Sequence, residues 1–256
     1  MNLNDIRLVS NLSNLSDKSK KKFNIEALSI SELFFRSLKI FRIKPKNFTV
    51  LTIILGTIDL PEDSSYSIEA KGFLHKPLPF NFDEYFSLTP YNKKKLILDT
   101  IYNCLISIAD KQQIDKDKLQ QAYDYCIENN LENKWLLGGK LLKSPSKKYY
   151  AAIECYWETD FFQITAIVYD NKKNELFRKQ LLKVAFDKPT GYLGYIYQYK
   201  PVWEVDTKNN EYLVFDIGNV FLKDQIKTKK WMINPDNQNV QTEDKEILSY
   251  LEDLEE

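Results

Sequence analysis

The sequence predicts an α+β protein in which one or two mostly antiparallel sheets pack against an antiparallel pair of helices. Three observations lead to this fold class. Strand-like runs with short polar breaks fill residues 148–186, two amphipathic segments of helical periodicity lie within residues 90–129, and strands precede and follow those helices. With 256 residues, of which 43% are hydrophobic, the chain can form a packed core.

The first 43 residues contain a polar segment followed by a mixed one. Residues 11–22 are polar and end in three lysines, so we predict a mobile N-terminal arm over residues 1–22. Residues 24–43 combine alternating apolar positions, which favour a strand, with Ser31-Glu32-Leu33, which suits a helix start. We predict a strand for this segment.

The next two apolar runs predict a β-hairpin. Residues 48–59 are dense in Val, Ile and Thr, which is typical of a buried strand. Residues 61–65 predict a turn, and the alternation over 66–74 predicts a second strand that returns beside the first.

Two helices are predicted in the middle of the chain. Thr89 is a suitable N-cap and Pro90 suits the first helical position, where its missing N–H leaves no bond unmade. An apolar stripe then continues over residues 90–111. Asp115 can cap a second helix over residues 116–129, and the short link predicts that the two helices are antiparallel neighbours.

The C-terminal half is predicted to be mostly strand. Three runs rich in Tyr, Ile, Val, Phe and Trp, split at 158–160 and 170–174, predict an antiparallel meander over residues 148–186. Residues 201–205 and 211–217 predict one more hairpin. Residues 223–231 show no decisive pattern.

We predict one α+β domain over residues 23–234, followed by an acidic tail at 235–256. The last fourteen residues hold seven acids and one lysine, with apolar residues spaced as in a short amphipathic helix. Lys+Arg and Asp+Glu each number 36, so no overall charge attracts nucleic acid, and we expect no nucleic-acid partner.

Cysteine usage and hydropathy predict a cytoplasmic protein without a membrane partner. Cys104, Cys126 and Cys155 are odd in number and lie among apolar residues, as expected of buried reduced thiols. The longest apolar run, residues 50–58, is well short of the roughly 20 residues that span a bilayer.

Catalytic signatures are missing, so we predict a protein that is not an enzyme and uses neither cofactor nor metal. His75 is the single histidine, and its sequence neighbours supply neither a carboxylate nor a nucleophile. One histidine and three scattered cysteines do not match a common zinc site. The seven glycines lack the spacing of a dinucleotide or phosphate-binding loop.

One triplet predicts an alternative function. Asp59 followed by Glu69-Ala70-Lys71 resembles the D…ExK pattern of the restriction-endonuclease-like nucleases. The resemblance implies that the two carboxylates hold Mg²⁺ and that the lysine assists the attacking water.

The candidate binding residues are tyrosines of one segment and a nearby tryptophan. On a strand, Tyr195, Tyr197 and Tyr199 project from one face, and Tyr192 and Trp203 can join them. Large, stiff rings with polar tips are favoured at protein-binding surfaces. The alternative is that the stripe packs under the helices as part of the core.

In overall style the chain resembles the immunity proteins that accompany bacterial polymorphic toxins. The likeness consists of an aromatic sheet, a helix pair and Asn- and Lys-rich loops, with no diagnostic motif. It implies a bacterial protein that neutralises a toxin domain by stoichiometric binding, with the acidic tail steering association. The alternatives are the metal-dependent nuclease and an adaptor or subunit of an unrelated complex.

Overall fold

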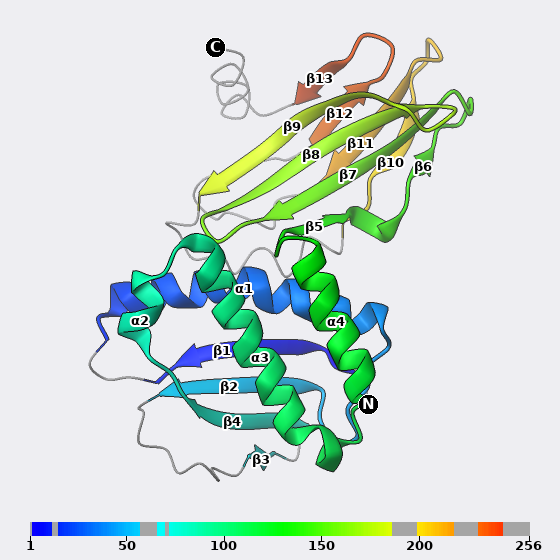
Figure 1. Cartoon of the computed structure of the whole chain (residues 1–256). Helices are drawn as coiled ribbons and strands as arrows, with labels where there is room; N and C mark the ends of the chain where they lie inside the picture. The colour runs from blue at the N-terminus through cyan, green and yellow to red at the C-terminus, as the bar shows by residue number, and fades with distance from the viewer. Residues whose placement is uncertain are drawn as a thin grey trace. The chain divides into compact units, whose positions relative to one another are not determined.

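The chain folds into two compact units. The computed structural model describes residues 2–11, 15–56, 66–69, 72–185, 199–217 and 230–242. The first unit comprises Met1–Asn133 with Glu158–Asp160, and the second comprises Lys134–Trp157 with Phe161–Glu256 (Figure 1). The predicted α+β class is confirmed. The range 23–234, predicted as a single domain, is instead divided between the two units, because each has its own hydrophobic core.

The sheet of the first unit is mainly parallel. Its strands are β1 (Asp5–Ser10), β2 (Val50–Gly56), β3 (Ser67–Ile68) and β4 (Phe73–Pro79), in the order β1-β2-β4-β3. The predicted hairpin of 48–59 with 66–74 is wrong, because β2 pairs with β4 in parallel. The pattern of apolar residues predicts strands but not their direction, and the chain between β2 and β4 is long enough for a parallel crossover. Among the described strands of this sheet, β3 alone is antiparallel to its neighbour, which is β4.

A long helix, α1 (Asp17–Ile40), connects β1 to β2. The strand prediction for residues 24–43 is therefore wrong. The Ser16 side chain accepts a hydrogen bond from the Ser19 N–H at 3.1 Å and caps the helix. The buried apolar residues recur at intervals of three or four, the helical period, at Phe23, Ala27, Ile30, Phe34 and Leu38.

The segment predicted as a mobile arm contains regular structure. Within residues 1–22, β1 pairs with β2 in parallel, and the first turns of α1 begin at Asp17. Ile6 and Leu8 of β1 are buried, which the polar composition of 11–22 obscured. The lysines at 20–22 lie on the partly exposed start of the helix.

The predicted antiparallel helix pair is confirmed. It consists of α3 (Pro90–Gln112) and α4 (Lys116–Glu128), preceded by the short α2 (Phe82–Ser87). The Thr89 side chain accepts from the Asn92 N–H, and the Asp115 carboxylate accepts from the N–H groups of Asp117 and Lys118. Both caps are the residues that the sequence predicts.

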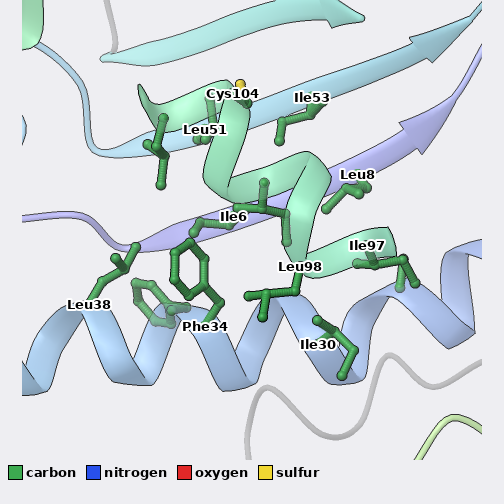
Figure 2. Close-up of a cluster of buried hydrophobic side chains, with 14 of the residues drawn as sticks. Ile6, Leu8, Ile30, Phe34, Leu38, Leu51, Ile53, Ile97, Leu98 and Cys104 are labelled. Carbon is green, nitrogen blue, oxygen red and sulfur yellow. The ribbon is translucent and has the colours of Figure 1, made fainter. Parts of the chain in front are cut away.

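The core of the first unit lies where these helices meet one face of the sheet. Figure 2 shows side chains of β1 and β2 meeting those of α1 and α3. Because side chains alternate along a strand, Leu51 and Ile53 enter this core while Thr52 points to the opposite face. The labelled members are Ile6, Leu8, Ile30, Phe34, Leu38, Leu51, Ile53, Ile97, Leu98 and Cys104.

The second unit contains two sheets. One consists of β5 (Asn133–Leu136), β6 (Leu142–Lys143), β7 (Tyr149–Trp157), β8 (Phe161–Asp170) and β9 (Glu175–Ala185), with a 3-10 turn at Leu137–Gly139 after β5. The other consists of β10 (Val202–Val205), β11 (Glu211–Asp216), β12 (Lys230–Asn234) and β13 (Asn239–Thr242). The predicted meander, β7-β8-β9, and the predicted hairpin, β10-β11, are both confirmed as antiparallel.

The two sheets of this unit share one core, and in Figure 1 the β7-β8-β9 sheet lies in front of the other. Ile153 and Cys155 of β7 and Ile164 of β8 enter this core from one sheet. Phe215 and Trp231 enter it from the other, with their rings stacked 5.9 Å apart. This arrangement is a β-sandwich.

None of the three cysteines forms a disulfide, and all three are buried, as the sequence predicts. Burial raises the pKa of Cys104 to about 12 and that of Cys126 to about 11, so both thiols stay protonated at neutral pH. Among the described helices, none has the length and apolar character needed to cross a bilayer.

Candidate protein-binding surface

Two of the five predicted binding residues lie in the described part of the chain. Tyr199 and Trp203 are half-buried and pack against the core of the second unit. The indole N–H of Trp203 donates to the Leu142 carbonyl at 3.2 Å, which ties β10 to β6. Tyr192, Tyr195 and Tyr197 lie outside the described residues.

The nuclease triplet lies only in part within the described residues. Asp59 and Lys71 lie outside them, and the Glu69 carboxylate is 3.2 Å from His75 Nε2. The Glu69 side chain is 63% exposed. Within the described ranges, no group of three or more His, Cys, Asp or Glu residues is arranged to hold a metal ion.

A different surface gathers aromatic and charged side chains. We define the outer face as the side of the β7-β8-β9 sheet that points away from the core of the second unit. Strand alternation places on it the residues that lie between the core residues of β7 and β8. These are Tyr150, Ala152, Glu154 and Tyr156 of β7 and Phe161, Gln163, Thr165, Ile167 and Tyr169 of β8.

The outer face has a buried centre between aromatic ends. Ala152 pairs with Ile167 across the two strands, and both are almost fully buried, at 0% and 1% exposure. Tyr150 pairs with Tyr169 on one side of this centre. On the other side the rings of Tyr156 and Phe161 meet edge to face at 5.3 Å. Tyr150, Tyr169, Tyr156 and Phe161 are half-buried.

Lysine ammonium groups lie over these rings. The Lys134 ammonium is 4.4 Å from the Tyr156 ring centre, and the Lys183 ammonium is 4.0 Å from that of Phe161. Attraction between a cation and a ring face contributes about 0.5–1 kcal/mol at an exposed site. It also restricts a side chain that is otherwise flexible.

Arg178 of β9 completes the face. Its guanidinium donates to both oxygens of Glu175, at 2.8 and 2.9 Å, and to Glu154 at 3.5 Å. The hydrogen bonds that Arg178 donates to Glu175 raise the pKa of Arg178 and lower the pKa of Glu175. Because Arg178 pairs with Ile167, this ion network lies beside the buried centre.

The turns of the second unit gather at one end of it, which we name the loop end. It comprises the turns at 144–148, 170–174, 206–210 and 235–238. Asp170 pairs with Tyr149 next to the first two turns. The Ser146 N–H and hydroxyl donate to Glu211, which begins β11, at 2.5 and 2.7 Å. The Tyr149 hydroxyl donates to Asp236 at 2.6 Å. These bonds connect the four turns across the two sheets.

Two of these turns share one local motif, Asp-x-Lys-x-Asn. Oδ1 of Asp170 accepts from the N–H groups of Lys172 and Asn174, and Oδ2 accepts from the Asn174 side chain. Asp206 makes the same bonds with Lys208 and Asn210. These hydrogen bonds lower the pKa of both aspartates, so both are ionised at neutral pH. Both turns therefore have a fixed backbone.

Glu211 gives a pH-dependent prediction. Burial raises the pKa of its carboxyl group, but the hydrogen bonds from Ser146 and Ser144 and the charge of Lys148 together outweigh burial, and the net pKa lies below the ordinary value of 4.5. The stability that ionised Glu211 contributes to the folded state is therefore fully present above pH 4.5. It is lost as the pH falls through the lowered pKa of Glu211. We expect Glu211→Gln to lower the free energy of unfolding at pH 7 by about 1–2 kcal/mol.

The measurement is urea unfolding followed by tryptophan fluorescence, because all four tryptophans, at 135, 157, 203 and 231, lie in the second unit. The difference from the unsubstituted protein should shrink as the pH is lowered toward 3. Glu204→Gln is the control, since its side chain is about half exposed. A loss of stability in Glu211→Gln that stays constant with pH would contradict the conclusion that the ionised Glu211 carboxylate stabilises the fold.

The outer face was missed at the sequence level, although a signal was present. Residues 149–157 and 161–170 read as continuous β-prone runs, and their aromatic residues were all attributed to strand formation. Separating alternate positions places mostly apolar core residues on one side, including Trp157 and Phe162, and gathers Glu154, Gln163 and most of the tyrosines on the other. The lysines over the rings come from other strands and turns, which no local pattern predicts.

Comparison with known proteins gives one likeness. Residues 164–256 match the model of a family described as nontoxic nonhaemagglutinin C-terminal. The match begins within β8, includes β9 to β13 and covers less than half of the chain. Searches of curated proteins and of solved structures give no match. The C-terminal part of the second unit is thus similar to part of this family.

Proposed function

We propose that the protein acts by binding another protein, without catalysis, through the outer face of its second unit. The observation that carries the proposal is the combination of half-buried rings, lysines and Arg178 around an apolar centre. Interfaces obtain most of their binding energy from a few Tyr, Trp and Arg side chains at a desolvated centre. The rings and the guanidinium are held in place by contacts within the unit, which reduces the entropy lost on binding.

The finer form of the proposal is an immunity protein that neutralises a bacterial toxin domain by stoichiometric binding. The style of the chain supports this form, and the likeness of residues 164–256 to the nontoxic nonhaemagglutinin C-terminal family supports a toxin-associated protein-binding role. An inhibitor of this kind covers a functional surface of its target and needs no catalytic group. Tyr192, Tyr195, Tyr197, Tyr199 and Trp203 remain proposed contributors to binding, and the acidic tail remains a proposed steering element.

Alanine substitution on the outer face tests the proposal. A partner is first identified by co-purification from the native cell, and the affinity and dissociation rate of the purified complex are then measured by surface plasmon resonance. We expect Tyr156→Ala and Tyr169→Ala each to weaken binding by about 2 kcal/mol or more, mostly through faster dissociation.

Tyr91→Ala is the matched control, because Tyr91 is an exposed tyrosine of α3 in the first unit. Tryptophan fluorescence in urea checks that both outer-face variants remain folded. If both bind as tightly as the control variant, the outer face is not the binding surface.

A further inference from the structure

We infer that the loop end of the second unit binds an acidic segment of the partner protein. The inference rests on the proposed function and names the chemistry that the partner presents. It goes beyond the outer face, because most of the side chains involved come from the turns.

The first argument is the distribution of charge at the loop end. Six exposed lysines lie in or beside its turns, at positions 143, 147, 148, 172, 173 and 208. Five carboxylates lie in or beside the turns too, at Asp170, Glu175, Asp206, Glu211 and Asp236. Each of these five accepts hydrogen bonds from the unit itself. The six lysines outnumber these carboxylates, whose oxygens already accept hydrogen bonds, so ammonium groups are what this end offers to a carboxylate of a partner.

The second argument is the convergence of two lysines on one ring. The ammonium groups of Lys143 and Lys173 lie 5.6 and 5.7 Å from the centre of the Tyr150 ring. They come from β6 and from the β8–β9 turn, and register places Lys143 opposite Tyr150. Within the described part of the chain, neither ammonium has an ion-pair partner. Two like charges held near one ring repel each other, and a carboxylate bound beside them removes that repulsion.

The third argument favours a peptide over a nucleic acid. Proteins that bind single strands without sequence preference offer aromatic faces on which bases stack. Here lysines of the same unit already lie over Tyr150, Tyr156 and Phe161. What the surface offers is ammonium groups in fixed places, which suits carboxylates carried along an extended acidic segment.

A polyglutamate peptide of about twelve residues, labelled with a fluorophore, is the direct probe. Binding to the full chain is measured by fluorescence anisotropy at low ionic strength, and it should weaken as salt is added. We expect the double variant Lys143→Gln/Lys173→Gln to weaken binding by about tenfold or more, since its two substitutions remove two charges from one site.

Lys140→Gln/Lys200→Gln is the matched control. It removes the same charge from exposed lysines of the same unit, outside the loop end. An effect within about twofold is expected for this pair. Equal weakening by both pairs would show that only net charge matters and would overturn the inference. An absence of peptide binding, or tighter binding of a thymidine oligonucleotide of equal length, would overturn it as well.

Measuring the Lys143→Gln/Lys173→Gln double variant in the purified partner complex distinguishes a failure of this inference from a failure of the proposed function. If Tyr156→Ala and Tyr169→Ala weaken the complex but Lys143→Gln/Lys173→Gln does not, the outer face binds the partner and the acidic-segment inference fails. If the lysine pair weakens the complex and the tyrosine variants do not, the loop end binds an acidic partner and the proposed role of the outer face fails.

Discussion

Replacing Trp231 with alanine is expected to lower the free energy of unfolding of the second unit by about 3–5 kcal/mol. Trp231 is fully buried and lies on β12, between β11 and β13. Its ring stacks on Phe215 at an interplanar angle of 13°. Alanine would leave a cavity between the two sheets that the neighbouring strands cannot fill without losing their pairing.

Urea unfolding followed by the fluorescence of the three remaining tryptophans measures this loss. Trp231→Phe should cost less, because phenylalanine keeps much of the ring and removes an indole N–H that has no acceptor among the described residues. Trp203→Ala is the comparison, since Trp203 is only half-buried. A Trp231→Ala loss no larger than that of Trp203→Ala would show that the two sheets do not share this core.

The elements that the sequence predicted correctly have short-range signals. For α3 and α4, a capping residue, a helical period and a short link are all adjacent in the chain, and each agrees with the others. The same holds for the β7-β8-β9 meander, where breaks of three to five residues at 158–160 and 170–174 permit only antiparallel pairing. Agreement among these local signals was sufficient to predict the helix pair and the meander.

The errors concern α1 and the direction of β4. Within a window of five residues, Ile25-x-Ala27-x-Ser29 resembles the alternation of a strand. The buried stripe of a helix is visible only over the full 24-residue segment. The parallel pairing of β2 with β4 depends on contacts between residues about 23 apart, such as Val50 with Phe73. No local pattern specifies such a pairing, and proximity in sequence wrongly favoured a hairpin.

The division into two units also lacks a compositional signal. The first unit ends at Asn133, which is fully buried and donates to the Ser29 carbonyl at 2.7 Å, while Arg36 donates to its side-chain oxygen. No Pro- or Ser-rich linker marks this boundary. β5 begins at this residue, so one strand contains the last residue of one unit and the first residues of the other.

The candidate surface could be predicted only in part. The alternation of Tyr150 and Tyr156 with core residues is readable in the sequence, and so is the repeated Asp-x-Lys-x-Asn motif. The placement of Lys143 and Lys173 at one ring is not readable, because it depends on the register of β6 with β7 and on the β8–β9 turn. A binding surface is assembled across strands, and strand register is a property of the whole fold.

The first unit contains a buried ionic cluster with a comparably large expected effect. The Glu26 carboxylate on α1 accepts from the Tyr85 hydroxyl at 2.7 Å and from the Lys93 ammonium at 3.4 Å. Tyr85 is fully buried, and Glu26 and Lys93 are each 9% exposed. Burial, followed by the bond to Glu26, raises the pKa of Tyr85, so its hydroxyl remains a donor throughout the physiological pH range.

Glu26→Ala is therefore expected to lower the free energy of unfolding of the first unit by about 3–5 kcal/mol, because it leaves a buried ammonium group without its counter-ion. Circular dichroism at 222 nm in urea measures the loss, since all the described α-helices lie in this unit. Lys22→Ala is the control: its ammonium is 3.9 Å from the same carboxylate but its side chain is 60% exposed, so a change within about 0.5 kcal/mol is expected. Glu26→Leu combined with Lys93→Met should recover most of the stability, because replacing both charges leaves neither one buried alone. If the double variant is as unstable as Glu26→Ala, the loss comes from packing around Phe23 and Tyr85 or from the Tyr85 hydroxyl left without its acceptor, and not from the unpaired charge.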